Sequence, residues 1–217
     1  MSAVVRLYLL RHGEPENTRM FYGHHDVDLS PRGREHVDQQ VRALADCTFD
    51  EIHASDLRRA RIGGDALAHA RGLAPTYASA LREMHLGCLE GVLYDDARER
   101  HPELVARSYL DMYDFRMPGG GESVRDTAER VRGYVEDLVV RGWAESESRT
   151  ILLYVHNTVN RILLGLAAGC GAHGYGRFAQ RYGAINRVDL LRPAAGRDLW
   201  SRATIVFANW DPRHPCP

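Results

Sequence analysis

Short apolar runs recur along the chain at intervals that suit strands separated by helices. Residues 4–10 and 151–155 are rich in Val and Leu and have the length of a buried strand. A weaker strand is predicted at residues 49–54, and two more at residues 184–191 and 203–208. The chain between these runs carries helical patterns instead.

The clearest helical pattern is an apolar stripe with three-to-four-residue spacing. Its members are Val124, Ala128, Val131, Val135, Leu138 and Val139. Ser123 and Asp126 predict a capping box at the start of this helix, and Gly142 predicts its end. Ser30 and Pro31 predict the start of an earlier helix, because Ser is a good N-cap and Pro suits the first helical position.

Two further helices are predicted at strand-to-helix junctions. Ser55 and Asp56 are expected to cap one of them, and the other follows His156. Strands alternating with amphipathic helices predict an α/β fold, a three-layer α/β/α architecture with a mostly parallel central sheet. We expect a single domain over residues 1–217, with helical spacing over residues 95–117 and a break at 118–121 marking a lid segment at about 95–121.

Composition narrows the classes of function. The formal net charge is −1, so no basic field favours nucleic acid as a partner. No apolar stretch reaches the roughly 20 residues of a membrane span, and no signal pattern precedes residue 4, so we expect no membrane partner and a cytoplasmic location. The four cysteines form no CxxC pair, which favours free, buried thiols over a disulfide framework or a zinc site.

Candidate chemistry gathers where two predicted strands end. The first run leads directly into Arg11-His12-Gly13-Glu14, and the run at 151–155 leads into His156. Ligands in open α/β sheets bind beyond the carboxyl ends of the strands. Both histidines are therefore expected to face one pocket.

These residues belong to a longer ordered set. It comprises Arg11-His12-Gly13-Glu14, Ser55-Asp56-Leu57-Arg58-Arg59-Ala60, Glu83 with Gly87 and Glu90-Gly91, Gly121-Glu122-Ser123, and His156. The set resembles the histidine phosphatase (phosphoglycerate mutase-like) superfamily in order and spacing. Within it, the chain looks most like the phosphatase branch that contains α-ribazole phosphatase and broad-specificity sugar phosphatases.

The resemblance implies a role for each catalytic candidate. His12 would be the nucleophile and form a phosphohistidine, which suits an imidazole that is neutral near pH 7. Arg11, Arg59 and His156 would surround the phosphoryl oxygens, while Arg58 would lie on the surface. Glu83 would be the general acid and base, and we expect its partial burial to raise its pKa. Glu90 is a nearby acidic alternative.

The resemblance also suggests residues that shape the pocket. Tyr22 and Gly23 are expected at its mouth, and Asn17 or Thr18 would supply a polar contact. Two stretches depart from the family pattern. Pro15, Asn17 and Thr18 stand where a Thr and then a Trp-Asn pair are common, and Asn157 follows the second histidine where Gly is usual. Asn tolerates left-handed backbone, so the turn after His156 is expected to survive.

The predicted function is a metal-independent phosphatase that hydrolyses a small-molecule phosphomonoester through a phosphohistidine on His12. No cofactor or metal is implied, the expected partner is a small phosphate ester, and a homodimer is one possible assembly. A phosphoglycerate-type phosphomutase is the alternative within the same fold. A non-catalytic phosphate-binding module is the alternative from another class, although such a module needs no proton donor such as Glu83.

Overall fold

The structure, a computed structural model, describes residues 3–108, 111–145 and 148–214. One six-stranded sheet in the order β3-β2-β4-β1-β5-β6 crosses the molecule. The strands are β1 (Val4–Arg11), β2 (Glu51–Ser55), β3 (Thr76–Ala78), β4 (Ser148–Val155), β5 (Ile185–Leu191) and β6 (Ala203–Trp210). Strands β3, β2, β4 and β1 are parallel, whereas β5 runs antiparallel to β1 and β6. The predicted mostly parallel sheet is confirmed.

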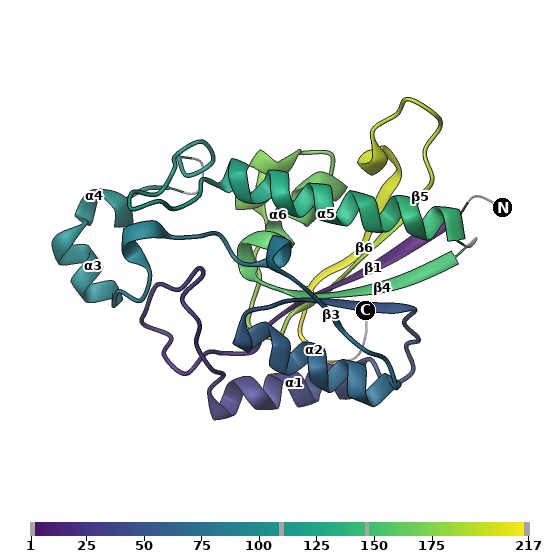
Figure 1. Cartoon of the computed structure of the whole chain (residues 1–217), viewed down its shortest axis with the longest axis horizontal. Helices are drawn as coiled ribbons and strands as arrows, with labels where there is room; N and C mark the ends of the chain where they lie inside the picture. Colours follow the sequence, from purple (N-terminus) through teal and green to yellow (C-terminus); the bar gives the residue numbers. More distant parts are fainter. Residues whose placement is uncertain (1–2, 109–110, 146–147, 215–217) are drawn as a thin grey trace.

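Helices cover both faces of this sheet (Figure 1). They are α1 (Pro31–Ala43), α2 (Arg58–Arg71), α3 (Tyr94–Arg100), α4 (Pro102–Val105), α5 (Val124–Glu145) and α6 (Asn157–Ala167). Short 3₁₀ turns are η1 (Ser79–Leu81), η2 (Gly87–Leu89), η3 (Ala172–Arg177) and η4 (Leu199–Arg202). Helices α1 and α2 lie on one face and α5 and α6 on the other, which confirms the three-layer α/β/α prediction.

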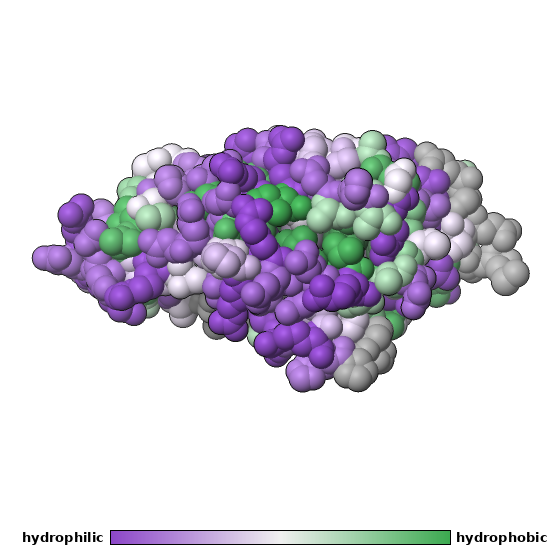
Figure 2. Space-filling model, turned by 90° about the horizontal axis from the view of Figure 1, so that it is seen from below, coloured by the Kyte–Doolittle hydropathy of each residue, from purple (hydrophilic) through white to green (hydrophobic). Residues whose placement is uncertain are grey.

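The strand alternation divides the core into two apolar clusters, one on each face of the sheet. Leu7 and Leu9 of β1 pack in the cluster beneath α5 and α6, and Leu10 packs in the cluster beneath α1 and α2. Strand β4 follows the same rule, because successive side chains of a strand point to opposite faces. Burying a leucine contributes about 1.5–3 kcal/mol. The surface on the α1 and α2 side is mostly hydrophilic (Figure 2).

Two of the predicted helix starts are confirmed. Ser30 is the N-cap of α1, where its hydroxyl accepts a hydrogen bond from the Gly33 N–H. At the start of α5, the Asp126 N–H donates to the Ser123 hydroxyl at 3.2 Å, and the Ser123 N–H donates to the Asp126 carboxylate at 2.8 Å. The predicted capping box therefore closes in both directions.

The predicted cap of α2 is wrong. Leu57, not Ser55 or Asp56, occupies the N-cap position, and the N–H of Arg58 at the start of the helix donates to the Asp26 carboxylate at 2.8 Å. The Asp56 carboxylate instead accepts two hydrogen bonds from Arg82, at 2.6 and 2.7 Å. A bidentate pair with arginine competes successfully with the local backbone for this carboxylate.

The predicted end of α5 at Gly142 is also wrong, because the helix continues to Glu145. Gly142 ends a helix only if it adopts a left-handed conformation, and it does not. Its small size serves packing: a Cβ there would lie 3.0 Å from a methyl carbon of Val5. The next residue, Trp143, is buried, and its indole N–H donates to the Leu190 carbonyl.

The lid segment is less helical than its spacing predicts. Helix α3 ends at Arg100, α4 ends at Val105, and the residues described after Val105 form turns up to α5. Pro102 disfavours helical backbone at the residue before it, which separates the two helices. Farther on, the Asp111 carboxylate accepts hydrogen bonds from the Ser108 N–H and hydroxyl. Residues 109–110, where the pattern expected an aromatic and an apolar helix position, lie outside the described residues.

The cysteines that the structure describes, Cys47, Cys88 and Cys170, are free thiols. The sequence predicted buried thiols, whereas these three are half-buried. Cys216 lies outside the described residues. Among the described helices, none is long and apolar enough to cross a membrane.

Candidate active site

The two histidines meet because their strands are neighbours. Arg11 is in register with Val155 in the parallel β1–β4 pair, so the residues that follow them leave the sheet side by side. The rings of His12 and His156 lie 5.2 Å apart between centroids. Both side chains are buried, with exposed fractions of 3% and 0%. The geometry thus brings the two buried rings together at the ends of neighbouring strands.

The His12 ring is held in one tautomer. Its Nδ1 lies 2.7 Å from the Gly13 carbonyl oxygen, and a carbonyl accepts only, so Nδ1 carries the proton. Nε2 is then left with its lone pair. Gly13 is required at the turn, because a Cβ there would lie 2.1 Å from the carbonyl oxygen of Gly33 in α1.

Burial and two arginines keep both histidines neutral. Burial, followed by the charges of Arg59 and Arg11, lowers the pKa of His12 well below its ordinary value of 6.5. Burial also lowers the pKa of His156 well below 6.5, again with a contribution from Arg59. At neutral pH the site therefore holds two uncharged imidazoles between fixed positive charges.

Arg59 enters the site from the first turn of α2. Its side chain is fully buried, and its guanidinium donates to the carbonyls of Gly23 at 2.7 Å and His25 at 3.1 Å. The adjacent Arg58 points outward and pairs with Asp28 at 2.7 Å. The predicted division between an inward Arg59 and a surface Arg58 is the one found.

Arg11 is the second arginine close to His12. Its guanidinium donates to the Gln180 carbonyl at 2.5 Å and lies 4.0 Å from the centroid of the Tyr182 ring. The Tyr182 ring is also 5.8 Å from that of His12. Sequence reasoning missed Gln180 and Tyr182, because they lie in a segment without any helical or strand pattern.

Glu83 is fixed by two backbone N–H groups. Oε1 accepts from Met84 at 2.9 Å, and Oε2 accepts from Thr158 at 3.1 Å. Thr158 is in the first turn of α6, and this helix begins directly after His156. The structure thus brings the Glu83 carboxyl group to the end of β4, close to Arg11 and Arg59.

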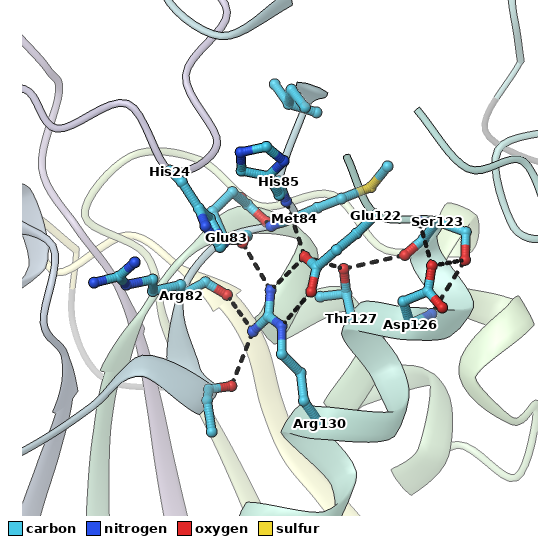
Figure 3. Close-up of polar contacts among 12 residues, drawn as sticks. His24, Arg82, Glu83, Met84, His85, Glu122, Ser123, Asp126, Thr127 and Arg130 are labelled. Atoms are coloured by element: carbon cyan, nitrogen blue, oxygen red, sulfur yellow. Dashed lines mark hydrogen bonds and ion pairs between the residues drawn. The ribbon is translucent and has the colours of Figure 1, made fainter. Parts of the chain in front are cut away.

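A half-buried ion pair between Arg130 and Glu122 holds the backbone around Glu83 (Figure 3). Arg130 of α5 donates to the carbonyls of Ala80, Arg82 and Glu83 at 2.7–2.9 Å. The same guanidinium binds the Glu122 carboxylate through two hydrogen bonds. Burial raises the pKa of Glu122, but the bonds and charge of Arg130 outweigh it and bring the pKa to about 2.

Glu90, the nearby acidic alternative to Glu83, is hydrogen-bonded to the backbone of the loop before α1. Its carboxylate accepts hydrogen bonds from the N–H groups of Gly23, His24, His25 and Leu86 at 2.6–3.1 Å. Burial raises its pKa, whereas these backbone bonds lower it, and the net shift is downward. A carboxylate with four donors shapes the loop rather than transferring protons.

The predicted pocket residues divide into two groups. Tyr22 lies beside Arg59, with 5.6 Å from the guanidinium carbon to the ring centroid, and Gly23 binds Arg59 through its carbonyl. Asn17 instead accepts from the Arg19 N–H and, through its carbonyl, from the Tyr22 hydroxyl. Thr18 is exposed. The structure therefore places Tyr22 and Gly23 at the site and Asn17 in the turn that supports them.

Asn157 is the first residue of α6, with His156 at the N-cap. It does not adopt left-handed backbone, since Asn209 is the one non-glycine residue with positive φ in the described part of the chain. Asn in place of the usual Gly is thus accommodated without strain. Among the described residues, no group of three or more His, Cys, Asp or Glu side chains is arranged to hold a metal ion.

Comparison with known proteins finds relatives of this chain among the histidine phosphatases. The model of the histidine phosphatase superfamily (branch 1) matches residues 7–200. Glucosyl-3-phosphoglycerate phosphatase of Mycolicibacterium vanbaalenii is 36% identical over 176 residues, covering 75% of this chain and 76% of that protein. Phosphoserine phosphatase 1 of Hydrogenobacter thermophilus is 27% identical over 162 residues, covering 74% of each. The α-ribazole phosphatase of Shigella flexneri shares the fold, with a TM-score of 0.80 and 24% identity over 95% of this chain and 96% of that one.

Proposed function

We propose that this chain, which belongs to the histidine phosphatase superfamily (branch 1), hydrolyses a small-molecule phosphomonoester without a metal ion. The observation that carries the proposal is the state of His12. Its Nδ1 is committed to the Gly13 carbonyl, and its pKa is lowered, so Nε2 is a free nucleophile at neutral pH. The phosphatases named above, at 36% and 27% identity, support the same activity.

In the first step, Nε2 of His12 attacks phosphorus and the bond from phosphorus to the ester oxygen breaks. Glu83, starting protonated, gives its proton to the leaving alkoxide, and the alcohol departs. The product is a phosphohistidine beside an ionised Glu83. The two backbone bonds that fix Glu83 at the start of α6 support this assignment, since they orient its carboxyl group.

In the second step, water attacks phosphorus and the bond between phosphorus and nitrogen breaks. The Glu83 carboxylate takes a proton from the water, so that inorganic phosphate leaves and both His12 and Glu83 return to their initial states. The acid of the first step is thus the base of the second.

Charge on the transferring group would be neutralised by Arg11 and Arg59. Phosphoryl transfer depends mainly on such positioning and electrostatic stabilisation. Neither ring nitrogen of His156 has a hydrogen-bond partner within the described residues, although the ring is completely buried. A buried polar group without a partner is costly, and a phosphoryl oxygen would satisfy it.

The test is phosphate release from a panel of small phosphomonoesters in the presence of EDTA, with His12→Ala as the control. We expect turnover by the wild-type protein and a loss of at least about 10³-fold in the variant. Turnover retained in His12→Ala would remove His12 as the nucleophile. If no compound is hydrolysed, acid-labile labelling of His12 by a bisphosphate would favour a mutase, and absence of labelling would favour a binding module.

A further inference from the structure

Three buried amide side chains form one hydrogen-bonded network next to Arg11, and the proposed chemistry uses none of them. Asn160 is on α6, Asn186 is on β5, and Gln180 lies in the segment that precedes β5. Their exposed fractions are 0%, 0% and 8%. Because buried amides are tolerated when they are hydrogen-bonded, their partners show what this network holds in place.

The amides of Gln180 and Asn186 bind each other in both directions. Gln180 Nε2 donates to Asn186 Oδ1 at 2.7 Å, and Asn186 Nδ2 donates to Gln180 Oε1 at 3.0 Å. Asn160 Nδ2 also donates to Gln180 Oε1, at 3.1 Å, and Gln180 Nε2 makes a second bond to the Ala179 carbonyl at 2.9 Å. All four hydrogen-bonding positions of the Gln180 amide are therefore filled.

Backbone groups fix the orientation of the Asn186 amide. Its Nδ2 donates to the Leu9 carbonyl of β1 at 2.7 Å, and its Oδ1 accepts from the Asn209 N–H of β6 at 2.7 Å. A carbonyl only accepts and an N–H only donates, so this amide has one possible orientation. Gln180, which is paired with it, has one orientation as well.

The edge of the sheet departs from regular pairing to supply that N–H. The β5–β6 register shifts between Ile185 and Arg187, so that Asn186 faces two residues of β6 rather than one. One of these is Asn209, the one non-glycine residue with positive φ in the described part of the chain, and its side chain accepts from the Arg181 N–H at 2.7 Å. Bulges and left-handed residues persist where the surrounding structure requires them, often next to active sites.

The network fixes the backbone of Gln180, which is the part of this residue that contacts the site. The Gln180 carbonyl accepts a hydrogen bond from the Arg11 guanidinium at 2.5 Å. Tyr182, whose ring centroid lies 4.0 Å from the Arg11 guanidinium carbon, is two residues farther along the same segment. This segment is neither helix nor strand between η3 and β5, so no regular backbone pairing holds it. The buried amides hold it instead.

We propose that Asn160, Gln180 and Asn186 position the Arg11 guanidinium for the phosphoryl group by fixing the carbonyl oxygen that binds it. The inference rests on the proposed function, since it takes Arg11 to contact the phosphoryl oxygens. A guanidinium that is held in place before the reaction stabilises charge on the transferring group without having to reorganise. The three amides are thus positioning residues that act through Arg11.

Gln180→Met tests the proposal, because it removes the side-chain amide at similar length and keeps the backbone carbonyl that binds Arg11. We expect kcat/KM for p-nitrophenyl phosphate to fall by about 10-fold to 10²-fold, as for a small displacement of a catalytic group. The same substitution introduced into Arg11→Ala should lower kcat/KM by less than about 2-fold further, because the group that it positions is gone. If the two losses multiply instead, Gln180 does not act through Arg11 and the proposal is overturned.

Leu67→Ala is the control for a loss of stability alone. Leu67 is fully buried on α2, two turns after Arg59, and takes no part in the network. Its effect on kcat/KM, expressed per folded molecule, should be small and the same with or without Arg11. Asn160→Ala removes a single donor to Gln180 and is the milder second variant if Gln180→Met does not fold. Its loss must also disappear in Arg11→Ala for the proposal to stand.

Binding of inorganic phosphate separates this inference from the proposed function. Titration calorimetry of the wild-type protein, the two single variants and the double variant gives the same comparison from Kd values and needs no turnover. If no phosphomonoester is hydrolysed but Gln180→Met weakens phosphate binding only when Arg11 is present, the proposed function fails and the positioning role stands. Hydrolysis with losses that multiply has the opposite meaning.

Discussion

The Thr158 backbone N–H donates to Oε2 of Glu83 at 3.1 Å and joins two segments that are far apart in sequence. One is the loop after η1, and the other is the helix that begins after His156. The bond places the Glu83 carboxyl group at the N-terminal turn of α6, next to a buried histidine. This is the position that the proposed proton transfer requires, a role that only the family resemblance implied from the sequence.

Replacing Glu83 with Gln should separate substrates by their leaving groups. Alkyl phosphates need a proton on the departing oxygen, so we expect their kcat to fall by about 10²–10⁴-fold. p-Nitrophenyl phosphate has a stable leaving group and should lose far less. Steady-state kinetics on both substrates measure the difference, and equal losses would remove Glu83 as the acid.

Arg58 and Arg59 form a matched pair for substitution by Ala. Arg59 is fully buried and binds two carbonyls, so Arg59→Ala should cost about 2–4 kcal/mol of unfolding free energy and most of the activity. Arg58 is exposed and should change stability by less than about 0.5 kcal/mol. Urea unfolding and phosphate release measure both variants. Similar effects at the two positions would contradict the assignment.

Glu122→Gln should lower stability and activity although it changes none of the residues proposed to act on phosphorus. The change removes the charge that Arg130 neutralises and leaves the guanidinium with the carbonyls around Glu83 (Figure 3). We expect a loss of about 2–4 kcal/mol in unfolding free energy and a reduced kcat. Glu129→Gln, an exposed position on the same helix, is the control. An unchanged urea midpoint in Glu122→Gln would show that the pair does not stabilise this loop.

Stability should fall in mild acid. His12 and His156 have pKa values well below 6.5 in the folded protein, so below pH 6.5 only the unfolded chain takes up these protons. Each group then lowers the unfolding free energy by up to about 1.4 kcal/mol per pH unit, and has no such effect above pH 6.5. Urea unfolding at pH 7.5, 6.5 and 5.5 measures the slope, which should be smaller in His156→Gln. An equal slope in that variant would refute the argument.

The parts of the site that follow strands are predictable from sequence. An apolar run followed by a histidine sets both the strand and the point where it ends, so local pattern alone is enough to place His12 and His156 together. Arg59 is assigned through the family resemblance instead, because a lone arginine at the start of a helix carries no such signal. For the two histidines, a short stretch of chain carries the information.

The parts that depend on tertiary contacts were not predictable. Tyr182 lies in a segment without a helical or strand pattern, and Arg130 lies on the well-predicted helix α5, where nothing local marks it out; only the fold brings them near Arg11 and Glu83. Asp56 has the composition of a cap, but Arg82 takes its carboxylate. Gly142 looks like a helix end, yet it does not adopt positive φ, and the helix continues through it to Glu145.

The central position of β1 in the sheet has a consequence for biosynthesis. Its neighbours, β4 and β5, begin at Ser148 and Ile185, so during synthesis β1 has no sheet partner until the segment from Ser148 onward has been made. This strand has side chains that are buried on both faces once folded. Nascent chains that already contain α1 to α5 therefore still expose it, and such non-local pairing slows folding and favours aggregation. Chaperone protection matters most during that interval, before β4 emerges.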